Sequence, residues 1–328
     1  MKITVLGAGA WGTALAKLLR QDAGHQITLW GHDAAHLQEI KATGRNERYL
    51  PGIELPGELI FETDLASAAV GADCVIVAVP SRALRKVTEA LKDFSGVAVS
   101  VTKGIEHHSG LTMCGVLEQT APRSTTAALS GPSLAMEVAR GIPTALVAAS
   151  TNPEALALTQ KLFHRPAFRV YSSTDLTGVE LGGALKNVIA IAAGICDGLG
   201  FGDNSKAALV TRGLAEMRRL GTTTTGAQPE TFAGLSGLGD LMVTCFSKLS
   251  RNRGFGERLG RGEKAAAILT SMKSVAEGYP TTRSAFELAR KHNVTTPIID
   301  EIYAALYEEK NPAKALQDLT TRSSKAED

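Results

Sequence analysis

The first stretch of the 328-residue sequence whose residues could do chemistry is GAGAWG, at positions 7–12. Its glycines have the GxGxxG spacing found where a turn holds the pyrophosphate of a dinucleotide. The turn follows an apolar, β-branched run at 3–6 and precedes an amphipathic segment at 11–21. In that context Gly7 permits the bend, Gly9 lets the backbone approach the pyrophosphate, and Gly12 allows close helix–strand packing. Because helix-start N–H groups attract anions, the stretch predicts a dinucleotide site, with a merely structural glycine turn as the alternative.

The end of the second predicted strand, 26–30, bears on the choice between the two dinucleotides. An acidic residue there binds the free ribose 2′-hydroxyl of NAD. His32 stands about where that acid is expected, and Arg45 and Arg48 follow it, so the sequence accommodates NADP or NAD. Asp33 leaves an alternative open, because it is either the hydroxyl-binding acid displaced by one or two residues or the N-cap of the next helix.

The elements that must position these residues follow from the hydrophobic pattern. Short β-branched runs predict strands at 3–6, 26–30, 59–62, 74–79, 97–102, 125–129, 145–149 and 168–171. Amphipathic segments between them predict helices at 11–21, 81–92, 111–120, 134–140 and 153–162. Such alternation is typical of a parallel, doubly wound sheet covered by helices.

After about residue 178 the strand-like runs end, and long helical patterns follow at 179–195, 207–220 and 282–291. We therefore predict an α/β Rossmann-type domain over 1–178, followed by an all-α domain over 179–328. The polar tail beyond residue 319 is expected to be frayed.

Composition narrows the class of partner. Hydrophobic residues make up 44% of the chain, which suffices for a large core, and 35 basic against 33 acidic residues give a net charge of +2. No basic field is therefore available for nucleic acid. The four cysteines are far apart and form no CxxC pair, which argues against a metal cluster and fits a reducing cytoplasm. The most apolar later stretch, 188–196, is too short to span a bilayer, so we expect a small-molecule partner and no stable membrane insertion.

A series of motifs then carries a resemblance. In chain order they read GAGAWGTALA, LWGHD, YLPG, VIVAVPS, TKGI, LSGPS, GALKNVIAIAAG, TRGLAEM, GLGDL, SRNR and AEGYPTT. Over nearly its whole length the sequence resembles the bacterial NAD(P)-dependent sn-glycerol-3-phosphate dehydrogenases. The resemblance implies a cytoplasmic oxidoreductase that interconverts dihydroxyacetone phosphate and sn-glycerol 3-phosphate by hydride transfer, supplying glycerol 3-phosphate for phospholipid synthesis. A homodimer is expected as well.

Two alternatives to this function deserve comparison. One is a related dehydrogenase of the same architecture that acts on a hydroxy acid or a sugar phosphate, and SRNR together with GLGDL argues against it. The other is a nicotinamide-binding sensor that has lost its chemistry. The presence of Lys103, Lys186 and Asp240 argues against the sensor.

The resemblance assigns the acid–base role to Lys186, in GALKN. Chemistry agrees, because a lysine that enters the apolar helix 188–193 is partly desolvated, and desolvation makes an ammonium a better proton donor. A lysine snorkelling at a helix rim is the alternative. Lys103, which ends a predicted strand at the edge where doubly wound folds bind ligands, is implied to contact both substrate and cofactor, and a surface lysine is its alternative.

The remaining implied substrate contacts follow strands or open helices. They are Gly131, Ser133, Asp240, Ser250, Arg251 and Asn252, together with Lys103 and Lys186. Ser250, Arg251 and Asn252 supply a hydroxyl, a planar guanidinium and an amide in consecutive positions, which suits a phosphate dianion. The alternative interpretation of Ser133 is a helix N-cap. For Ser250, Arg251 and Asn252 the alternative is an ordinary helix start with an exposed basic face.

The implied cofactor contacts are Gly7, Gly9, Ala10, Trp11, Gly12, His32, Lys103, Ala135, Arg251, Val275 and Glu277. Ala10 departs from the serine that is frequent in the family, but a backbone contact survives the change. Glu277 could equally cap a helix. No metal is implied, and His107 with His108 is expected to form a solvated loop.

Overall fold

The computed structural model describes residues 1–272 and 275–321, which divide into two compact units, Met1–Glu180 and Leu181–Asp328. The first unit contains one eight-stranded sheet with the order β3-β2-β1-β4-β5-β6-β7-β8. Its strands are β1 (Lys2–Leu6), β2 (Gln26–Trp30), β3 (Ile60–Glu62), β4 (Cys74–Val77), β5 (Val97–Ser100), β6 (Thr125–Ser130), β7 (Thr144–Ala149) and β8 (Phe168–Ser173). The predicted doubly wound α/β class is confirmed.

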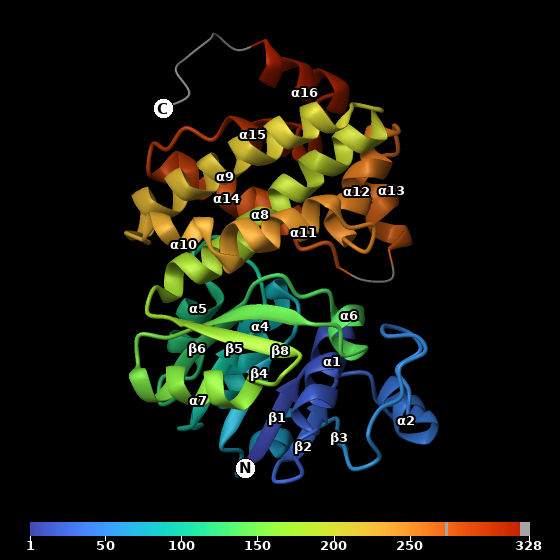
Figure 1. Ribbon diagram of the computed structural model, residues 1–328, viewed down its shortest axis with the longest axis vertical. Helices are drawn as coiled ribbons and strands as arrows, with labels where there is room; N and C mark the ends of the chain where they lie inside the picture. Colours follow the sequence, from blue (N-terminus) through green and yellow to red (C-terminus); the bar gives the residue numbers. More distant parts are fainter. Residues whose placement is uncertain (273–274, 322–328) are drawn as a thin grey trace. The chain divides into compact units, whose positions relative to one another are not determined.

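Helices flank this sheet, as Figure 1 shows for α1, α4, α5 and α7. They are α1 (Ala10–Leu19), α2 (Ala34–Thr43), α3 (Leu65–Ala69), α4 (Ser81–Thr88), the 3-10 turn η1 (Glu89–Leu91), α5 (Met113–Thr120), α6 (Ala135–Ala139) and α7 (Pro153–Phe163). Alternate residues of β1 and of β4 enter separate cores: Ile3 and Val5 pack with Leu15 of α1, whereas Leu6 packs with Leu84 of α4. This division follows from the two-residue period of a strand.

One strand pair departs from the predicted parallel sheet. β7 runs antiparallel to β6, while every other paired neighbour among the described strands is parallel. The connection between β6 and β7 contains only the five-residue α6, shorter than the predicted helix 134–140, so the chain returns beside β6 in the reverse direction. The N-cap of α6 is Leu134, so the interpretation of Ser133 as that cap was wrong.

The second unit is helical throughout its described residues, as predicted for the C-terminal part (Figure 1). Its helices are α8 (Leu176–Gly198), which begins in the first unit, α9 (Asp203–Thr225), α10 (Pro229–Ala233), the π-helical turn η2 (Leu235–Gly239), α11 (Asp240–Phe246), α12 (Arg251–Gly260), α13 (Ala265–Ser271), α14 (Gly278–Lys291), α15 (Pro297–Tyr307) and α16 (Pro312–Thr320). The predicted frayed tail falls largely on 322–328, outside the described residues.

Helix α8 is longer than the predicted helix 179–195, and its apolar part extends beyond the stretch 188–196 that we expected to be too short to span a bilayer. Among the described helices it alone is long and apolar enough to cross a membrane by length and composition. The most apolar 18-residue segment of this helix is completely buried in the protein. The longer helix arises because small residues such as Gly183 and Ala184 continue the apolar pattern on the N-terminal side of Lys186.

Glycine pairs set how closely α8 and α12 approach. A Cβ on Gly194 would meet the carbonyl of Arg253, and a Cβ on Gly256 would meet the carbonyl of Ile191. Gly198 and Gly260 face each other in the same way. The two backbones therefore pack in direct contact, an arrangement that side chains larger than hydrogen would prevent.

Candidate active site

The three glycines of the GAGAWG turn are each required for a different reason. Gly7 has φ +121°, a backbone conformation that favours glycine, and a Cβ there would lie 2.7 Å from the carbonyl oxygen of Ala78. A Cβ on Gly12 would collide with the carbonyl of Gly7. Around Gly9 the described chain leaves open space, with no atom within 4 Å of such a Cβ. Gly9 thus exposes backbone that a ligand can approach, as the sequence predicts.

The start of α1 beside this turn has the features of an anion site. Gly9 is its N-cap, and no side chain of the described residues caps the helix there. The indole N–H of Trp11 is buried and has no hydrogen-bond partner in the part of the chain that the structure describes. Helix-start N–H groups bind phosphates, so the turn and the first turn of α1, which contains Ala10, fit a dinucleotide.

Asn46 fixes this turn from a distant position, and the sequence analysis missed it. Its fully buried amide donates to the carbonyl of Ala8 at 3.0 Å and to the hydroxyl of Thr13 at 2.8 Å. Its oxygen accepts the N–H of Tyr49 at 3.3 Å. Asn46 therefore ties a loop after α2 to both ends of the glycine turn.

The end of β2 settles one question about Asp33. Its carboxylate accepts the backbone N–H of His36 at 3.0 Å and so caps α2, as one alternative held. The hydrogen bond from His36 lowers the pKa of Asp33, and Arg48, 3.2 Å away, lowers it further. His32 is exposed beside it.

Lys103, Gly131 and Ser133 come together after β5 and β6. The Lys103 Nζ donates to the carbonyl of Gly131 at 2.9 Å and to the hydroxyl of Ser133 at 3.1 Å. Ser133 donates to the same carbonyl at 2.8 Å, which Gly131 can present because its φ is +132°. Ala135 opens α6 and packs on the same small apolar cluster as Trp11. The structure thus groups the residues that the sequence placed at this edge of the sheet.

Lys186 lies buried in the second unit, and Asp240 and Thr244 are among its polar partners. Its Nζ is 2.9 Å from an Asp240 carboxylate oxygen and donates to the Thr244 hydroxyl at 2.7 Å. Thr244 in turn donates to the backbone carbonyl of Asp240 at 2.6 Å. Lys186 is therefore no rim lysine, and Thr244 is a member of this group that the sequence analysis missed.

The GLGDL motif explains why Asp240 can approach α8. Residues 235–239 form the π-helical turn η2, which runs directly into α11 at Asp240. A Cβ on Gly182 of α8 would meet the carbonyl of Ser236, and a Cβ on Gly237 would meet the backbone of Phe232. π-Turns are frequent at functional sites, and here the glycines allow one to lie against the helix that carries Lys186.

The SRNR motif lies at the start of α12, and its residues have different roles. Ser250 is its N-cap and accepts the N–H of Arg253. The Arg251 side chain is exposed, yet surrounding protein desolvates it enough to lower its pKa, which a charge interaction with Glu277 opposes. Water-accessible but crowded by protein, this guanidinium is placed to meet an anion.

Asn252 joins the separate parts of this site. Its amide donates to the Asn187 side-chain oxygen at 2.7 Å, and its own oxygen accepts the N–H of Gly278 at 2.9 Å. The first bond connects the neighbours of Lys186 and Arg251, and the second reaches the residue after Glu277. Asn187 is a further residue that the sequence analysis missed.

The other predicted positions have plain surroundings. Val275 is half-buried, and Glu277 occupies the N-cap position of α14 without a side-chain capping bond to the described helix. His107 and His108 stack on each other in a turn, with His108 exposed. The described residues contain no group of three His, Cys, Asp or Glu side chains that could hold a metal ion, and the four cysteines are buried, unpaired thiols.

Comparison with known proteins decides the family. Residues 2–156 match the N-terminal domain of NAD-dependent glycerol-3-phosphate dehydrogenase, and residues 175–317 match its C-terminal domain. The chain belongs to the NAD-dependent glycerol-3-phosphate dehydrogenase family. Its cofactor is therefore a nicotinamide dinucleotide, and it is an oxidoreductase.

Individual members of the glycerol-3-phosphate dehydrogenase family match along the whole chain. The NAD(P)+ enzyme of Geobacter sulfurreducens is 49% identical over 332 residues, which cover 99% of this chain and 98% of that one. A crystal structure of glycerol-3-phosphate dehydrogenase from Coxiella burnetii is 39% identical, with a TM-score of 0.94 over 98% of this chain and 99% of that chain. A ketopantoate reductase from Ralstonia eutropha, 17% identical with a TM-score of 0.62 over 96% of this chain and 99% of that one, shares the fold alone.

Proposed function

We propose that this protein reduces dihydroxyacetone phosphate to sn-glycerol 3-phosphate with NADPH or NADH, and that it catalyses the reverse reaction as well. The observation that carries the proposal is the hydrogen bond between Asn187 and Asn252. It holds the helix of the buried Lys186 to the helix of the exposed Arg251, so a proton donor and a phosphate-binding cation are fixed to one support. A guanidinium also binds carboxylates, so the choice of a phosphorylated substrate is supported by the family match as well.

Lys186 is the proton donor to the carbonyl oxygen in this scheme. Asp240 and Thr244 lie on one face of α11 and both contact the Lys186 Nζ, which fixes the direction from which the proton is delivered. When bound, the nicotinamide supplies the hydride. In the reverse direction the same amine accepts the proton of the alcohol.

Arg251 binds the substrate phosphate, and its two neighbours support it. Ser250 uses its oxygen lone pair to cap α12 but keeps its O–H proton for a phosphate oxygen. Asn252 already uses one N–H on Asn187 and its oxygen on Gly278, so it chiefly positions Arg251. A planar guanidinium can give a bidentate contact to the dianion.

The first unit takes the cofactor in this proposal, within the predicted boundaries 1–178, and residues 179–328 take the substrate and the chemistry. Lys103 and Ser133 contact substrate, and Lys103 also contacts the cofactor. We further propose that the enzyme works in the cytoplasm, supplies glycerol 3-phosphate for phospholipid synthesis, and forms a homodimer.

The decisive experiment compares two substrates and two arginine variants of one helix. Oxidation of NADPH is followed by absorbance with dihydroxyacetone phosphate and with unphosphorylated dihydroxyacetone. Arg251→Ala should remove about 3 kcal/mol of transition-state stabilisation for the phosphorylated substrate, because a charge-assisted contact is lost. Its kcat/KM should therefore fall roughly 150-fold. Arg258→Ala removes another arginine of α12, one that is partly exposed and pairs with Glu263; it is the matched control and should change little.

The wild type should already be very poor with plain dihydroxyacetone, because remote binding energy no longer orients the reacting carbon, and Arg251→Ala should lose little more there. Equal losses on both substrates would show that Arg251 serves the cofactor or the fold. Absence of any oxidation of NADPH or NADH with dihydroxyacetone phosphate would reject the proposed function itself.

A further inference from the structure

Residues 44–55 form a closed loop, the 44–55 loop, to which the proposed function assigns no role. It begins at Gly44, which ends α2 in the left-handed conformation, and it closes where the N–H of Leu55 donates to the carbonyl of Gly44 at 2.8 Å. Leu50 and Ile53 are buried in a cluster with Ala14 of α1. The loop is therefore packed onto the helix that starts at the glycine turn.

Asn46 fixes the position of the loop more firmly than packing alone. Its buried amide reaches the Ala8 carbonyl and the Thr13 hydroxyl. Because a buried amide with all its bonds made is costly to move, the residues next to Asn46 are held at a defined distance from the turn.

Arg48 is the residue that this anchoring presents to the end of β2. Its guanidinium is 3.2 Å from the Asp33 carboxylate and lies over the ring of Tyr49, 5.1 Å from its centre. Both charged side chains are about half-exposed, at 52% for Arg48 and 40% for Asp33. The bond to Asp33 uses only Nη1, and a guanidinium has further N–H groups, so Arg48 can bind a second anion while it stays paired with Asp33.

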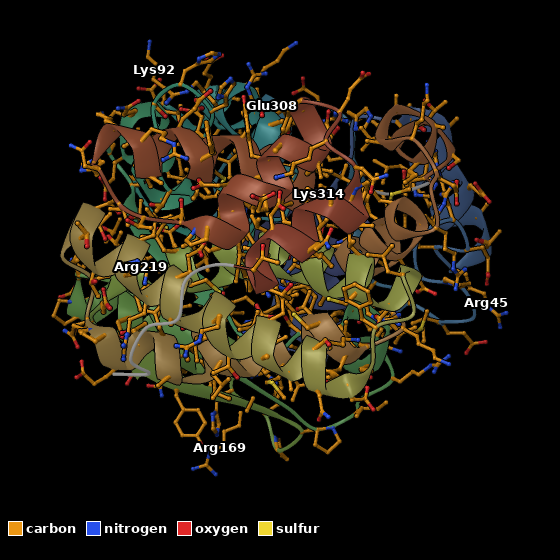
Figure 2. All side chains as sticks on the ribbon, turned by 90° about the horizontal axis from the view of Figure 1, so that it is seen from above. Arg45, Lys92, Arg169, Arg219, Glu308 and Lys314 are labelled. Carbon is orange, nitrogen blue, oxygen red and sulfur yellow. The ribbon has the colours of Figure 1, made fainter. Side chains whose placement is uncertain are left out.

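Arg45, the other arginine of the loop, is directed elsewhere. It pairs with Glu54 at 2.5 Å, and in Figure 2 its side chain extends outward at the edge of the molecule. The loop thus offers a positive charge to the end of β2 through Arg48 alone among its described side chains. In doubly wound folds the end of β2 is where the adenosine ribose of a dinucleotide is recognised.

We propose that Arg48 determines cofactor choice by neutralising Asp33 and binding the 2′-phosphate of NADP. This rests on the proposed function only in taking the glycine turn as the dinucleotide site. An unpaired Asp33 would repel a 2′-phosphate, as an acid at this position does in NAD-specific sites. Paired with Arg48, the carboxylate keeps its place as the cap of α2 while its charge is compensated, so both dinucleotides are accepted.

The test measures dissociation constants of NADPH and NADH separately, by the fluorescence of the reduced nicotinamide, on the full-length protein without substrate. Arg48→Ala should raise the Kd of NADPH about tenfold or more, the loss of one charge-assisted bond, and change that of NADH less than about threefold. Asp33→Asn should shift the ratio in the opposite direction, toward NADPH. Asparagine is as good an N-cap as aspartate, so α2 keeps its cap in that variant.

Arg45→Ala is the matched control, since it removes the same charge from the same loop, and its Kd ratio should stay within about twofold of the wild type. An unchanged ratio in Arg48→Ala would overturn the proposal, and so would equal weakening of both dinucleotides, which would place Arg48 at the pyrophosphate or in the fold. The titration needs no turnover. A protein that shifts its ratio as expected but reduces no dihydroxyacetone phosphate would keep this inference and reject the proposed function, whereas turnover with an unshifted ratio would do the reverse.

Discussion

Replacing Glu216 by glutamine should remove a large part of the pH dependence of stability. Glu216 is buried on α9, and its two carboxylate oxygens accept the N–H groups of Ile298 and Ile299 at 3.0 and 2.8 Å. It thereby caps α15 from another helix. Burial raises its pKa from an ordinary 4.5 to about 7, although the two backbone N–H groups oppose this rise.

The sign and size follow from proton linkage. Between pH 4.5 and about 7 the folded protein keeps a proton on Glu216 that the unfolded chain has released, so the free energy of unfolding falls as pH rises through this window. The stabilisation linked to Glu216 is fully present below pH 4.5 and has been lost above about pH 7. At 1.36 kcal/mol per pH unit, this interval of about 2.5 units corresponds to about 3 kcal/mol. Glutamine does not ionise, so Glu216→Gln should lack this decrease.

Urea unfolding at pH 5 and pH 8, followed by far-UV circular dichroism, gives the two free energies. Because pH 5 already lies inside the window, the wild type should lose about 2.5 kcal/mol between them from Glu216, in addition to the loss from Glu180, whose burial also raises its pKa to about 7. In Glu216→Gln, the difference between the free energies of unfolding at pH 5 and pH 8 should be smaller by the amount that Glu216 contributes. Glu230→Gln, which changes an exposed glutamate on α10, should behave like the wild type. A difference in Glu216→Gln within about 0.5 kcal/mol of the wild-type difference would refute the reasoning.

Two other substitutions test the supports of the site. Asn46→Ala should weaken NADH binding by about tenfold, because the glycine turn loses its buried anchor, and NADPH binding by more, because Arg48 loses the same anchor; unchanged NADH binding in the fluorescence titration would contradict this. Gly256→Ala should lower the free energy of unfolding by about 1–3 kcal/mol because its Cβ would collide with the Ile191 carbonyl, whereas Gly254→Ala on the same helix, where no described atom lies within 4 Å, should raise it by about 0.5–1 kcal/mol. Urea denaturation measures both, and similar effects of the two alanines would disprove the packing argument.

Much of the fold could be predicted because its signals are local. All eight predicted strands lie within two residues of those observed, since each is a short buried run bounded by turn residues. The antiparallel β7 could not be predicted in the same way. Strand direction depends on where the chain between β6 and β7 travels, and the helical pattern at 134–140 looked like a crossover helix but is only the five-residue α6.

The same holds for the site: residues marked by a local sequence pattern could be predicted, and residues defined by distant partners could not. The roles of Lys103 and Lys186 remain predictions, but the sequence did single out both, because each adjoins an apolar run. Asn46 carries no such signal, since its partners Ala8 and Thr13 are more than thirty residues away. Thr244 had a usable signal: it lies four residues after Asp240 on α11, the spacing that puts two side chains on one helix face.

The length and apolar character of α8 have a single explanation in how the second unit holds its polar groups. A lysine and an asparagine in mid-helix, Lys186 and Asn187, must be buried with fixed partners, and fixed partners require neighbouring helices that cannot shift. Glycine contacts between α8 and α12 bring the backbones together, and a Cβ on Gly278 at the start of α14 would meet the Asn187 carbonyl. Such backbone contacts have no side-chain rotamers to change, so they hold the distance from Asn187 to Asn252 more tightly than interlocked side chains could. The apolar helix that by composition could cross a membrane is thus the rigid support on which a buried amine and an exposed guanidinium are held in register.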